Sequence, residues 1–200
     1  MRRTVLALLA TVAAIALTPE PASGSSPAPP RSCGPVRLTG SAPVPPPGRV
    51  VRQSISIGDD CRVVTGPVEL LAAPSRAARL ASAPFHTYSE MYDCCGILMT
   101  ALYTDSTAAS TTYSTHANRE PWDAGWSVRA ATECAADCAS GRYDHHAEFS
   151  YRGIFDVTGA WYDNAHDSAV VFDGDGTATC RQTVTLRHSF IGWNWVHGCG

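Results

Sequence analysis

Residues 177 to 199 read TATCRQTVTLRHSFIGWNWVHGC, and this stretch decides the predicted fold. In each half of it, apolar or cysteine side chains alternate with mostly polar ones, as in strands that turn one face to a core. A hairpin centred between Ser189 and Phe190 places Cys180 directly opposite Cys199, where a disulfide can form. The same register pairs three further positions on that face: Gln182 with His197, Val184 with Trp195, and Leu186 with Trp193. We therefore predict a Cys180–Cys199 bridge across a terminal hairpin, with both tryptophans in the core.

The chain before this hairpin has the same β character from Arg49 onward. Short segments rich in Val, Ile, Thr, Tyr and Trp are separated by Gly, Asp, Asn and Ser, a pattern typical of sandwiches and barrels. Only the Ala-rich pieces 72–82 and 131–139 favour a helical turn. We predict one all-β domain over residues 49 to 200, an antiparallel β-sandwich stapled by disulfides. The predicted strands are 50–57, 61–70, 86–93, 96–104, 109–115, 123–130, 143–151, 153–162, 168–173, 177–187 and 192–199.

The first 24 residues are predicted to be a secretory signal peptide. Two arginines precede an apolar run that is too short to span a bilayer, and small residues follow it. Ten of the fourteen prolines fall before Gly48, so residues 25 to 48 are predicted to be a proline-rich segment that runs extended or as a linker, outside any β-ladder. The mature protein is therefore expected to be secreted and extracellular, with no membrane insertion after signal cleavage.

The net charge excludes one class of partner. The chain has 15 Arg and no Lys against 18 Asp and Glu, and removal of the signal peptide takes away Arg2, Arg3 and Glu20. The mature net charge is then about −4 with neutral histidines. A nucleic-acid footprint or a polybasic membrane patch needs clustered positive charge. No nucleic-acid partner is expected.

Eight cysteines follow the signal peptide, and an even number in an exported chain indicates disulfides. Cys94 and Cys95 are predicted to bridge to Cys134 and Cys138, because a bridge between neighbours strains the peptide bond between them. A local Cys134–Cys138 bridge is the alternative. Zinc is not expected at Cys134 and Cys138, since no second pair of ligands with the usual spacing accompanies them. The full set is Cys33, Cys61, Cys94, Cys95, Cys134, Cys138, Cys180 and Cys199.

The sequence TECAADCASGRYDHHAEF, residues 132 to 149, holds residue types that bind metals or run nucleophilic chemistry. If 143–151 is a strand, successive side chains point to opposite faces. His145 then lies at the edge of the core, whereas Asp144, His146 and Glu148 share the outward face. Adjacent histidines on opposite faces do not hold one metal ion together. Asp144, His146 and Glu148 are kept as candidate ligand-binding residues.

Tryptophans are the other candidates for a binding surface, since flat rings on a β face hold sugars or protein partners. The hairpin register buries Trp193 and Trp195, and Trp161 shares the apolar face of the predicted strand 153–162. Trp122 and Trp126, in EPWDAGW, are left as ligand-binding candidates. Core burial is the alternative for both, because Trp is a frequent core residue of sandwiches.

Metal and cofactor motifs are incomplete. FDGDGT, residues 172 to 177, resembles the opening of a calcium loop, but the twelfth position is Val184, where an EF-hand has Glu. An Asp-Gly pair between β segments instead indicates a hairpin turn. No cofactor or metal ion is expected. The alternative is a weak calcium site that this segment makes together with Asp163, Asn164 and Asp167 from another loop.

The sequence contains no G-x-S-x-G, H-E-x-x-H or phosphate-binding glycine motif. The expected function is therefore non-catalytic extracellular binding of a glycan or of another secreted protein, with inhibition as one form of it. The alternative is a small secreted hydrolase that uses a His and a carboxylate. A sandwich fold hosts both classes of function, so the fold alone does not choose between them.

Overall fold

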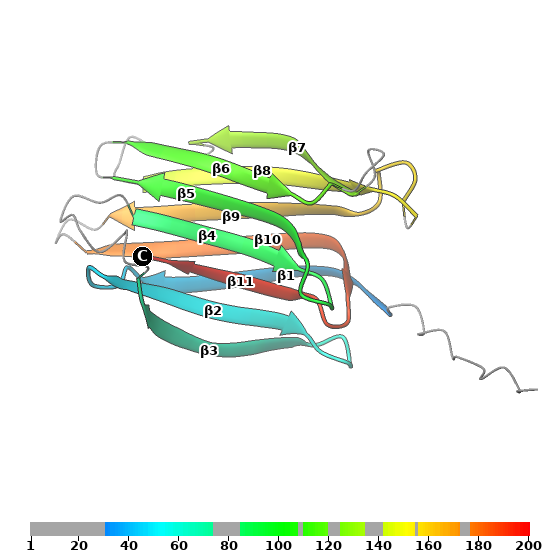
Figure 1. Ribbon diagram of the computed structural model, residues 1–200, viewed down its shortest axis with the longest axis horizontal. Coiled ribbons are helices and arrows are strands. Elements are labelled where there is room, and N and C mark those ends of the chain that lie inside the picture. The colour runs from blue at the N-terminus through cyan, green and yellow to red at the C-terminus, as the bar shows by residue number, and fades with distance from the viewer. Residues whose placement is uncertain are drawn as a thin grey trace, which may run out of the picture.

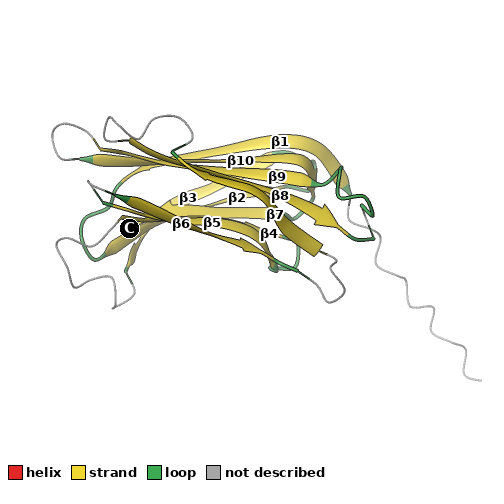
Figure 2. Cartoon of the chain, turned by 90° about the horizontal axis from the view of Figure 1, so that it is seen from above, coloured by secondary structure: helices red, strands yellow, loops and turns green. Residues whose placement is uncertain are grey.

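The computed structural model describes residues 31–73, 85–107, 110–119, 125–134, 142–154, 156–172 and 177–200. This part of the chain forms two antiparallel sheets packed face to face and contains no helix (Figures 1 and 2). The described residues accordingly include no helix long and apolar enough to cross a membrane. The predicted all-β antiparallel sandwich is confirmed. The strands are β1 (Ser32–Pro43), β2 (Arg49–Ile57), β3 (Val63–Ala72), β4 (Phe85–Tyr92), β5 (Leu98–Ser106), β6 (Thr111–Ala117), β7 (Gly125–Glu133), β8 (Arg142–Arg152), β9 (Asp163–Phe172), β10 (Ala178–Phe190) and β11 (Asn194–Cys199).

The strands divide into a five-stranded sheet, in the order β1-β10-β9-β8-β7, and a six-stranded sheet, in the order β3-β2-β11-β4-β5-β6. Inward and outward side chains alternate along the central strands. On β10, for example, Cys180, Gln182, Val184 and Leu186 are buried, while the residues between them are half-buried or exposed. This alternation turns one face of each sheet to a shared core.

The C-terminal strands do not form a hairpin, and the predicted register is wrong. β10 pairs with β1 and β9 in the five-stranded sheet, whereas β11 pairs with β2 and β4 in the six-stranded sheet. Cys180 and Cys199 nevertheless form the predicted disulfide, with 6.5 Å between their Cα atoms. His197 Nδ1 lies 3.1 Å from Gln182 Oε1, so a second predicted pair also meets. The predicted partners face each other across the core, from opposite sheets, and do not lie side by side.

The proline-rich segment supplies an edge strand, which corrects the prediction that residues 25 to 48 have no place in a ladder. β1 pairs with β10 and occupies the edge of the five-stranded sheet. Its prolines lie where an edge ladder tolerates them: Pro35 at a register shift and Pro43 at the end of the strand. Gly40 fits this strand because a Cβ at that position would overlap the ring of His197.

The predicted strand 153–162 is also wrong. Its described residues form the connection between β8 and β9, and β9 begins at Asp163 instead of at residue 168. Gly153 and Gly159 flank Asp156 in this connection, and such a pattern is a turn signal that outweighs the aromatic and apolar residues beside it. Trp161 is therefore exposed and not part of the core.

Among the described cysteines, Cys94 and Cys95 are free thiols. The predicted bridges from this pair to Cys134 and Cys138 are therefore wrong. Cys94 and Cys95 lie in the β4–β5 turn, whereas Cys134 follows the end of β7 on the opposite side of the sandwich, too far for a bridge. Cys134 is itself disulfide-bonded. Two disulfides have both of their cysteines among the described residues, Cys33–Cys61 and Cys180–Cys199.

Several predictions fall outside the described residues. They concern the signal peptide 1–24, Trp122, Cys138, the Asp-Gly turn at 173–176 and most of the Ala-rich piece 72–82. The other Ala-rich piece begins inside β7, so residues 131 to 133 are strand and not a helical turn.

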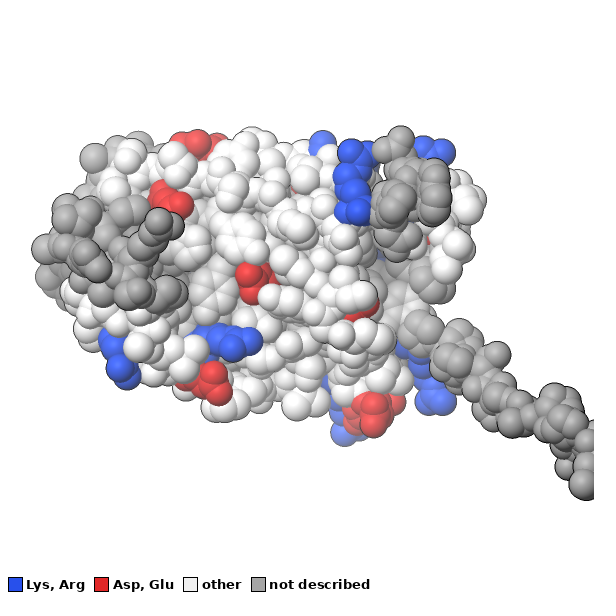
Figure 3. Space-filling model, viewed as in Figure 1, with Lys and Arg blue, Asp and Glu red and all other residues white. Residues whose placement is uncertain are grey.

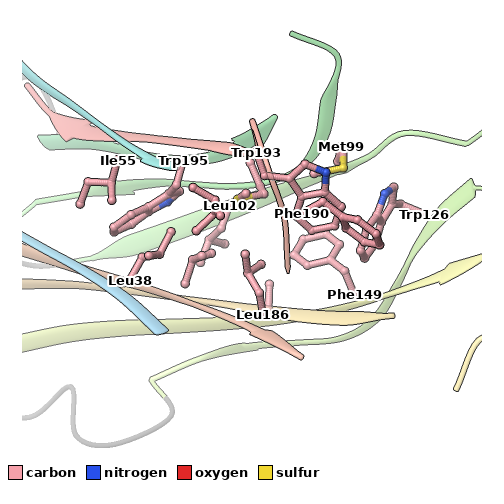
Figure 4. Close-up of a cluster of buried hydrophobic side chains, with 14 residues drawn as sticks. Leu38, Ile55, Met99, Leu102, Trp126, Phe149, Leu186, Phe190, Trp193 and Trp195 are labelled. Carbon is pink, nitrogen blue, oxygen red and sulfur yellow. The ribbon is translucent and has the colours of Figure 1, made fainter. Parts of the chain in front are cut away.

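The interior between the sheets is apolar at one end and partly polar elsewhere. Figure 4 shows Trp126, Phe149 and Phe190 packed together at the apolar end. Elsewhere, hydroxyl groups link the sheets. Thr87 Oγ1 lies 2.7 Å from Thr104 Oγ1 and 2.8 Å from Ser168 Oγ, and all three residues are buried. Each buried hydroxyl thus has a partner, which makes a polar interior tolerable.

Candidate functional site

Two hollows lie at the apolar end of the sandwich, which we call the aromatic end. Three connections meet there: the β4–β5 turn, the β10–β11 turn and the β8–β9 loop (Figure 1). The β8–β9 loop, Gly153–Tyr162, borders one hollow, and the two turns border the other. Tyr162 contributes to both. Loops gathered at one end of a sandwich are the usual place for binding residues.

The carboxylate of Asp156 organises the β8–β9 loop. One oxygen accepts hydrogen bonds from the backbone N–H groups of Thr158 and Gly159, both at 3.0 Å, and from the Thr158 hydroxyl at 2.7 Å. The other oxygen accepts from the backbone N–H groups of Trp161 and Tyr162. Residues 158 to 162 are thus wrapped around one side chain and have a defined shape without regular secondary structure.

This carboxylate stays ionised at neutral pH. Burial favours the protonated form of Asp156, but the hydrogen bonds from Thr158 and from the loop N–H groups outweigh burial and hold the pKa of Asp156 well below its usual range. The negatively charged carboxylate that accepts these hydrogen bonds is therefore present at neutral pH.

The ordered loop presents apolar side chains to solvent. Ile154 is 87 % exposed, Val157 is 72 % exposed and Trp161 is 61 % exposed. Next to them lies a hollow of about 270 Å³ that Val157, Trp161, Tyr162 and His188 help to line. Single exposed apolar residues are ordinary, but three of them on one fixed loop beside a hollow are typical of an interaction site.

The second hollow is a cavity between the two sheets, of about 220 Å³. Its walls are largely aromatic, and the close ring contacts include Phe190 with Trp193 at 5.1 Å and Trp126 with Tyr151 at 5.6 Å. Cys94 of the β4–β5 turn stands at its border. We call this hollow the aromatic cavity.

Of the predicted tryptophan candidates, Trp126 is buried and forms part of the wall of the aromatic cavity. Among the described tryptophans the exposed one is Trp161, which the sequence pattern places on the apolar face of a strand. The turn signal around Asp156 could have identified it, because a residue in a loop has no inward strand face.

The predicted polar candidates lie elsewhere, on the outer face of the five-stranded sheet. His146 Nδ1 lies 2.7 Å from Asp167 Oδ1 and its Nε2 lies 3.3 Å from Glu148 Oε1. Burial lowers the pKa of His146, but these two carboxylates outweigh burial and the pKa is raised. Asp144 is buried and pairs separately with Arg142 at 2.8 Å. Neither hollow includes these residues.

His145 points inward, as the alternation predicts, and its Nε2 lies 3.0 Å from Thr111 Oγ1. The alternative calcium site includes residues 173 to 176, which lie outside the described part of the chain. Asp163 pairs with arginines, Asn164 is buried, and Asp167 contacts His146. Among the described residues no group of three or more His, Cys, Asp or Glu could hold a metal ion.

A tyrosine-rich patch occupies the outer face of the six-stranded sheet. Glu90 accepts hydrogen bonds from Tyr92 at 2.9 Å and from Tyr103 at 2.8 Å. His86 stacks on Tyr103 with 6.2 Å between ring centroids. Figure 3 views this side of the molecule and shows few charged residues on it. This flat surface is a second place where a ligand with a broad apolar face can rest.

Comparison of the chain with protein-family models, with curated proteins and with solved structures finds no match.

Proposed function

We propose that this chain is a secreted, non-catalytic binding protein that recognises another extracellular protein through the Gly153–Tyr162 loop. The observation that carries the proposal is the loop itself, in which the buried Asp156 carboxylate accepts a hydrogen bond from the backbone N–H of Trp161. The side chains of Ile154, Val157 and Trp161 are exposed on this loop. Apolar anchors dominate binding energy in protein interfaces, and Trp is the most enriched of them. A loop that already has its bound shape loses little entropy on binding.

The polar groups of the loop favour a protein over a glycan as its partner. A sugar needs several donors and acceptors that are free to bond its hydroxyls. Both oxygens of Asp156 are occupied, and Thr158 Oγ1 both donates to Asp156 and accepts from the N–H of Ala160. What the loop offers is therefore mainly apolar surface.

Secretion is the compartment that agrees best with the covalent structure. Disulfides such as Cys180–Cys199 persist in oxidising surroundings and are rare in reducing ones. The first 24 residues have the pattern of a secretory signal. Both observations support an extracellular role.

A glycan is the second candidate ligand, and the tyrosine-rich patch favours it. Tyr103 and Tyr92 surround one carboxylate on the outer sheet face, and their rings offer surfaces on which a sugar can stack.

Replacing Trp161 with Ala is expected to weaken partner binding at least about 30-fold, which corresponds to about 2 kcal/mol, because it removes the largest exposed anchor. The immobilised mature protein would be incubated with the culture secretome, and the Kd of each retained protein would be measured by surface plasmon resonance. Val64→Ala is the matched control, since Val64 is 53 % exposed on β3, away from the loop.

Equal retention by Trp161→Ala and by the unchanged protein would contradict the proposal. Retention of a polysaccharide that is lost in Tyr103→Ala and kept in Trp161→Ala would favour the glycan instead. Hydrolysis of a retained ligand that stops in His146→Ala would favour the hydrolase alternative.

Replacing Asp156 with Asn is expected to loosen the loop while leaving the sandwich intact. An amide nitrogen would then face backbone N–H groups that now donate to a carboxylate, so hydrogen exchange at Thr158, Gly159 and Trp161 should become at least about tenfold faster. Partner affinity should fall, but the midpoint of urea unfolding should change little. Because the pKa of Asp156 is depressed in the fold, the unchanged loop should lose its protection only as the pH falls below about 4.

The matched control for Asp156→Asn is Asp60→Asn. Asp60 Oδ1 accepts from the backbone N–H of Arg62 in an exposed turn, so the chemical change is the same but the site is remote. Unaltered exchange in Asp156→Asn would show that the carboxylate does not hold the loop.

A further inference from the structure

Cys94 and Cys95 lie in a turn that holds their sulfur atoms together. The two Sγ atoms are 3.0 Å apart, and both residues are exposed. Asp93 Oδ1 accepts hydrogen bonds from the N–H groups of Cys95 at 2.9 Å and Ile97 at 2.8 Å, and Gly96 N–H donates to Asp93 O at 3.3 Å. The turn thus fixes the backbone on both sides of the pair. A disulfide needs the sulfur atoms only about 1 Å closer.

The pair differs from the buried Cys180–Cys199 bridge in its surroundings. Cys180 and Cys199 are buried in their bridge between the sheets. Cys94 and Cys95 are accessible to small thiols and disulfides, and a bridge between sequence neighbours strains the peptide bond that joins them. Strained and exposed disulfides are the ones that are reduced most readily. A bridge at this turn would therefore open and close under conditions that leave the buried bridge intact.

We propose that Cys94 and Cys95 are a reversible redox site that closes to a vicinal disulfide by exchange with a low-molecular-weight disulfide. The thiolate of one cysteine attacks the small disulfide, forms a mixed disulfide and releases one small thiol. The second cysteine attacks the protein sulfur of that mixed disulfide and releases the second small thiol. Two cysteine thiols lose two electrons and two protons in total, and the small disulfide gains both.

The redox state of this turn acts on the aromatic cavity. Cys94 borders the cavity, and a Cβ placed on Gly192 would lie 3.0 Å from Cys94 Cβ, so the two turns touch. Gly192 precedes Trp193, which forms part of the cavity wall together with Phe190. Drawing Cys94 toward Cys95 therefore displaces a group that supports this wall. The inference does not depend on what the Gly153–Tyr162 loop binds.

The experiment equilibrates the mature protein in buffers of reduced and oxidised glutathione and then alkylates free thiols with iodoacetamide. In reduced buffer, peptide mapping should find Cys94 and Cys95 alkylated, with Cys180 and Cys199 still bridged. In oxidised buffer, the peptide that contains Cys94 and Cys95 should carry neither carbamidomethyl groups nor glutathione. Its mass should be that of the unmodified dithiol peptide less two hydrogen atoms. The Cys95→Ser variant is the matched control, because one thiol cannot close the ring and should retain glutathione as a mixed disulfide.

Three outcomes would overturn the proposal: alkylation of both cysteines in every buffer, stable glutathione on the unchanged pair, or a bridge from either cysteine to a third one. Nuclear magnetic resonance tests the link to the cavity. Oxidation should shift the amide signal of Gly192 and the indole signal of Trp193, and leave the indole signal of Trp161 in place. Shifts confined to Cys94 and Cys95 would show that the pair does not act on the cavity.

Discussion

Replacing Cys180 and Cys199 together by Ala is expected to lower the free energy of unfolding by about 3 kcal/mol. The bridge spans a sequence separation of 19, and a crosslink of that length restricts the unfolded chain by roughly this amount in the loop-entropy account. It also ties the two sheets together through the core, where both sulfur atoms are buried. Alanine is the better replacement, because a serine hydroxyl there would add a buried polar group that needs a partner.

Urea unfolding followed by tryptophan fluorescence measures this loss. Cys33→Ala, Cys61→Ala is the matched control, since that bridge spans 28 residues but is only half-buried. The entropic account predicts a similar loss in the free energy of unfolding for both double variants. A larger loss for the Cys180 and Cys199 variant would measure the additional contribution from packing of its two buried sulfur atoms. A loss below about 1 kcal/mol for the buried pair would contradict the prediction. Partner binding should not change, because this bridge lies at the opposite end of the sandwich from the β8–β9 loop.

Acidification from pH 6.5 to pH 4 is expected to cost about 3 kcal/mol of the free energy of unfolding through His166 alone. Burial lowers the pKa of His166 to about 3, whereas an unfolded histidine has a pKa near 6.5. Between pH 6.5 and pH 4, His166 therefore binds a proton in the unfolded chain but stays neutral in the folded one. The contribution is fully present above pH 6.5 and falls as the pH is lowered toward 3.

The hydrogen bonds of His166 explain why its ring stays neutral. Trp195 Nε1 donates to Ser89 Oγ at 2.9 Å, so the Ser89 hydroxyl can donate to His166 Nδ1 at 2.8 Å. On the other side, His166 Nε2 lies 3.0 Å from Thr100 Oγ1 and can donate to it. If His166 Nδ1 were also protonated, it could no longer accept the hydrogen bond from the Ser89 hydroxyl, and two donors would face each other. The buried serine–histidine pair thus acts as a structural link between the sheets and has no access to a substrate.

Urea unfolding at a series of pH values checks this prediction, with His166→Gln as the test and His86→Gln as the matched control on the surface. The slope of stability against pH should flatten in His166→Gln and persist in His86→Gln. Should His166→Gln fail to fold, the signal of the His166 ring in the unchanged protein decides the matter. A His166 signal that titrates near pH 6 would contradict the prediction.

His146 works in the opposite direction and has to be separated from this effect. Its pKa is raised in the fold, so its contribution is fully present below about pH 6.5 and is lost as the pH rises through the folded pKa. Burial also lowers the pKa of His145 and of His197, so both add to the loss from His166 on acidification, and the gain from His146 opposes all three. The His166→Gln comparison removes the His166 contribution and leaves those of the other histidines.

Local patterns in the sequence predicted much of the fold because they depend on neighbouring residues. A period of two along β8 sends His145 inward and His146 outward, whatever the strand pairs with. The same period along β10 and β11 places Cys180 and Cys199 on core-facing sides, where they form the predicted disulfide although the hairpin register from which it was predicted is wrong. The same pattern failed at residues 153 to 162, because apolar residues there suit both a strand and an exposed loop. Asp156 stabilises the loop, since its carboxylate accepts hydrogen bonds from backbone N–H groups that would otherwise bond to a neighbouring strand.

By itself the sequence determined that the chain is all-β and which faces of its C-terminal strands turn inward. Only the tertiary structure decided that β10 and β11 belong to different sheets, that β1 completes the edge of one of them, and that Trp161 meets solvent while Trp126 forms a cavity wall. The physical reason is that alternation sets the direction of each side chain relative to its own backbone, and two inward faces look the same in sequence whether the strands lie side by side or face each other across a core. The choice between these arrangements depends on hydrogen bonds to β2, β4 and β9, which are distant along the chain and leave no local pattern.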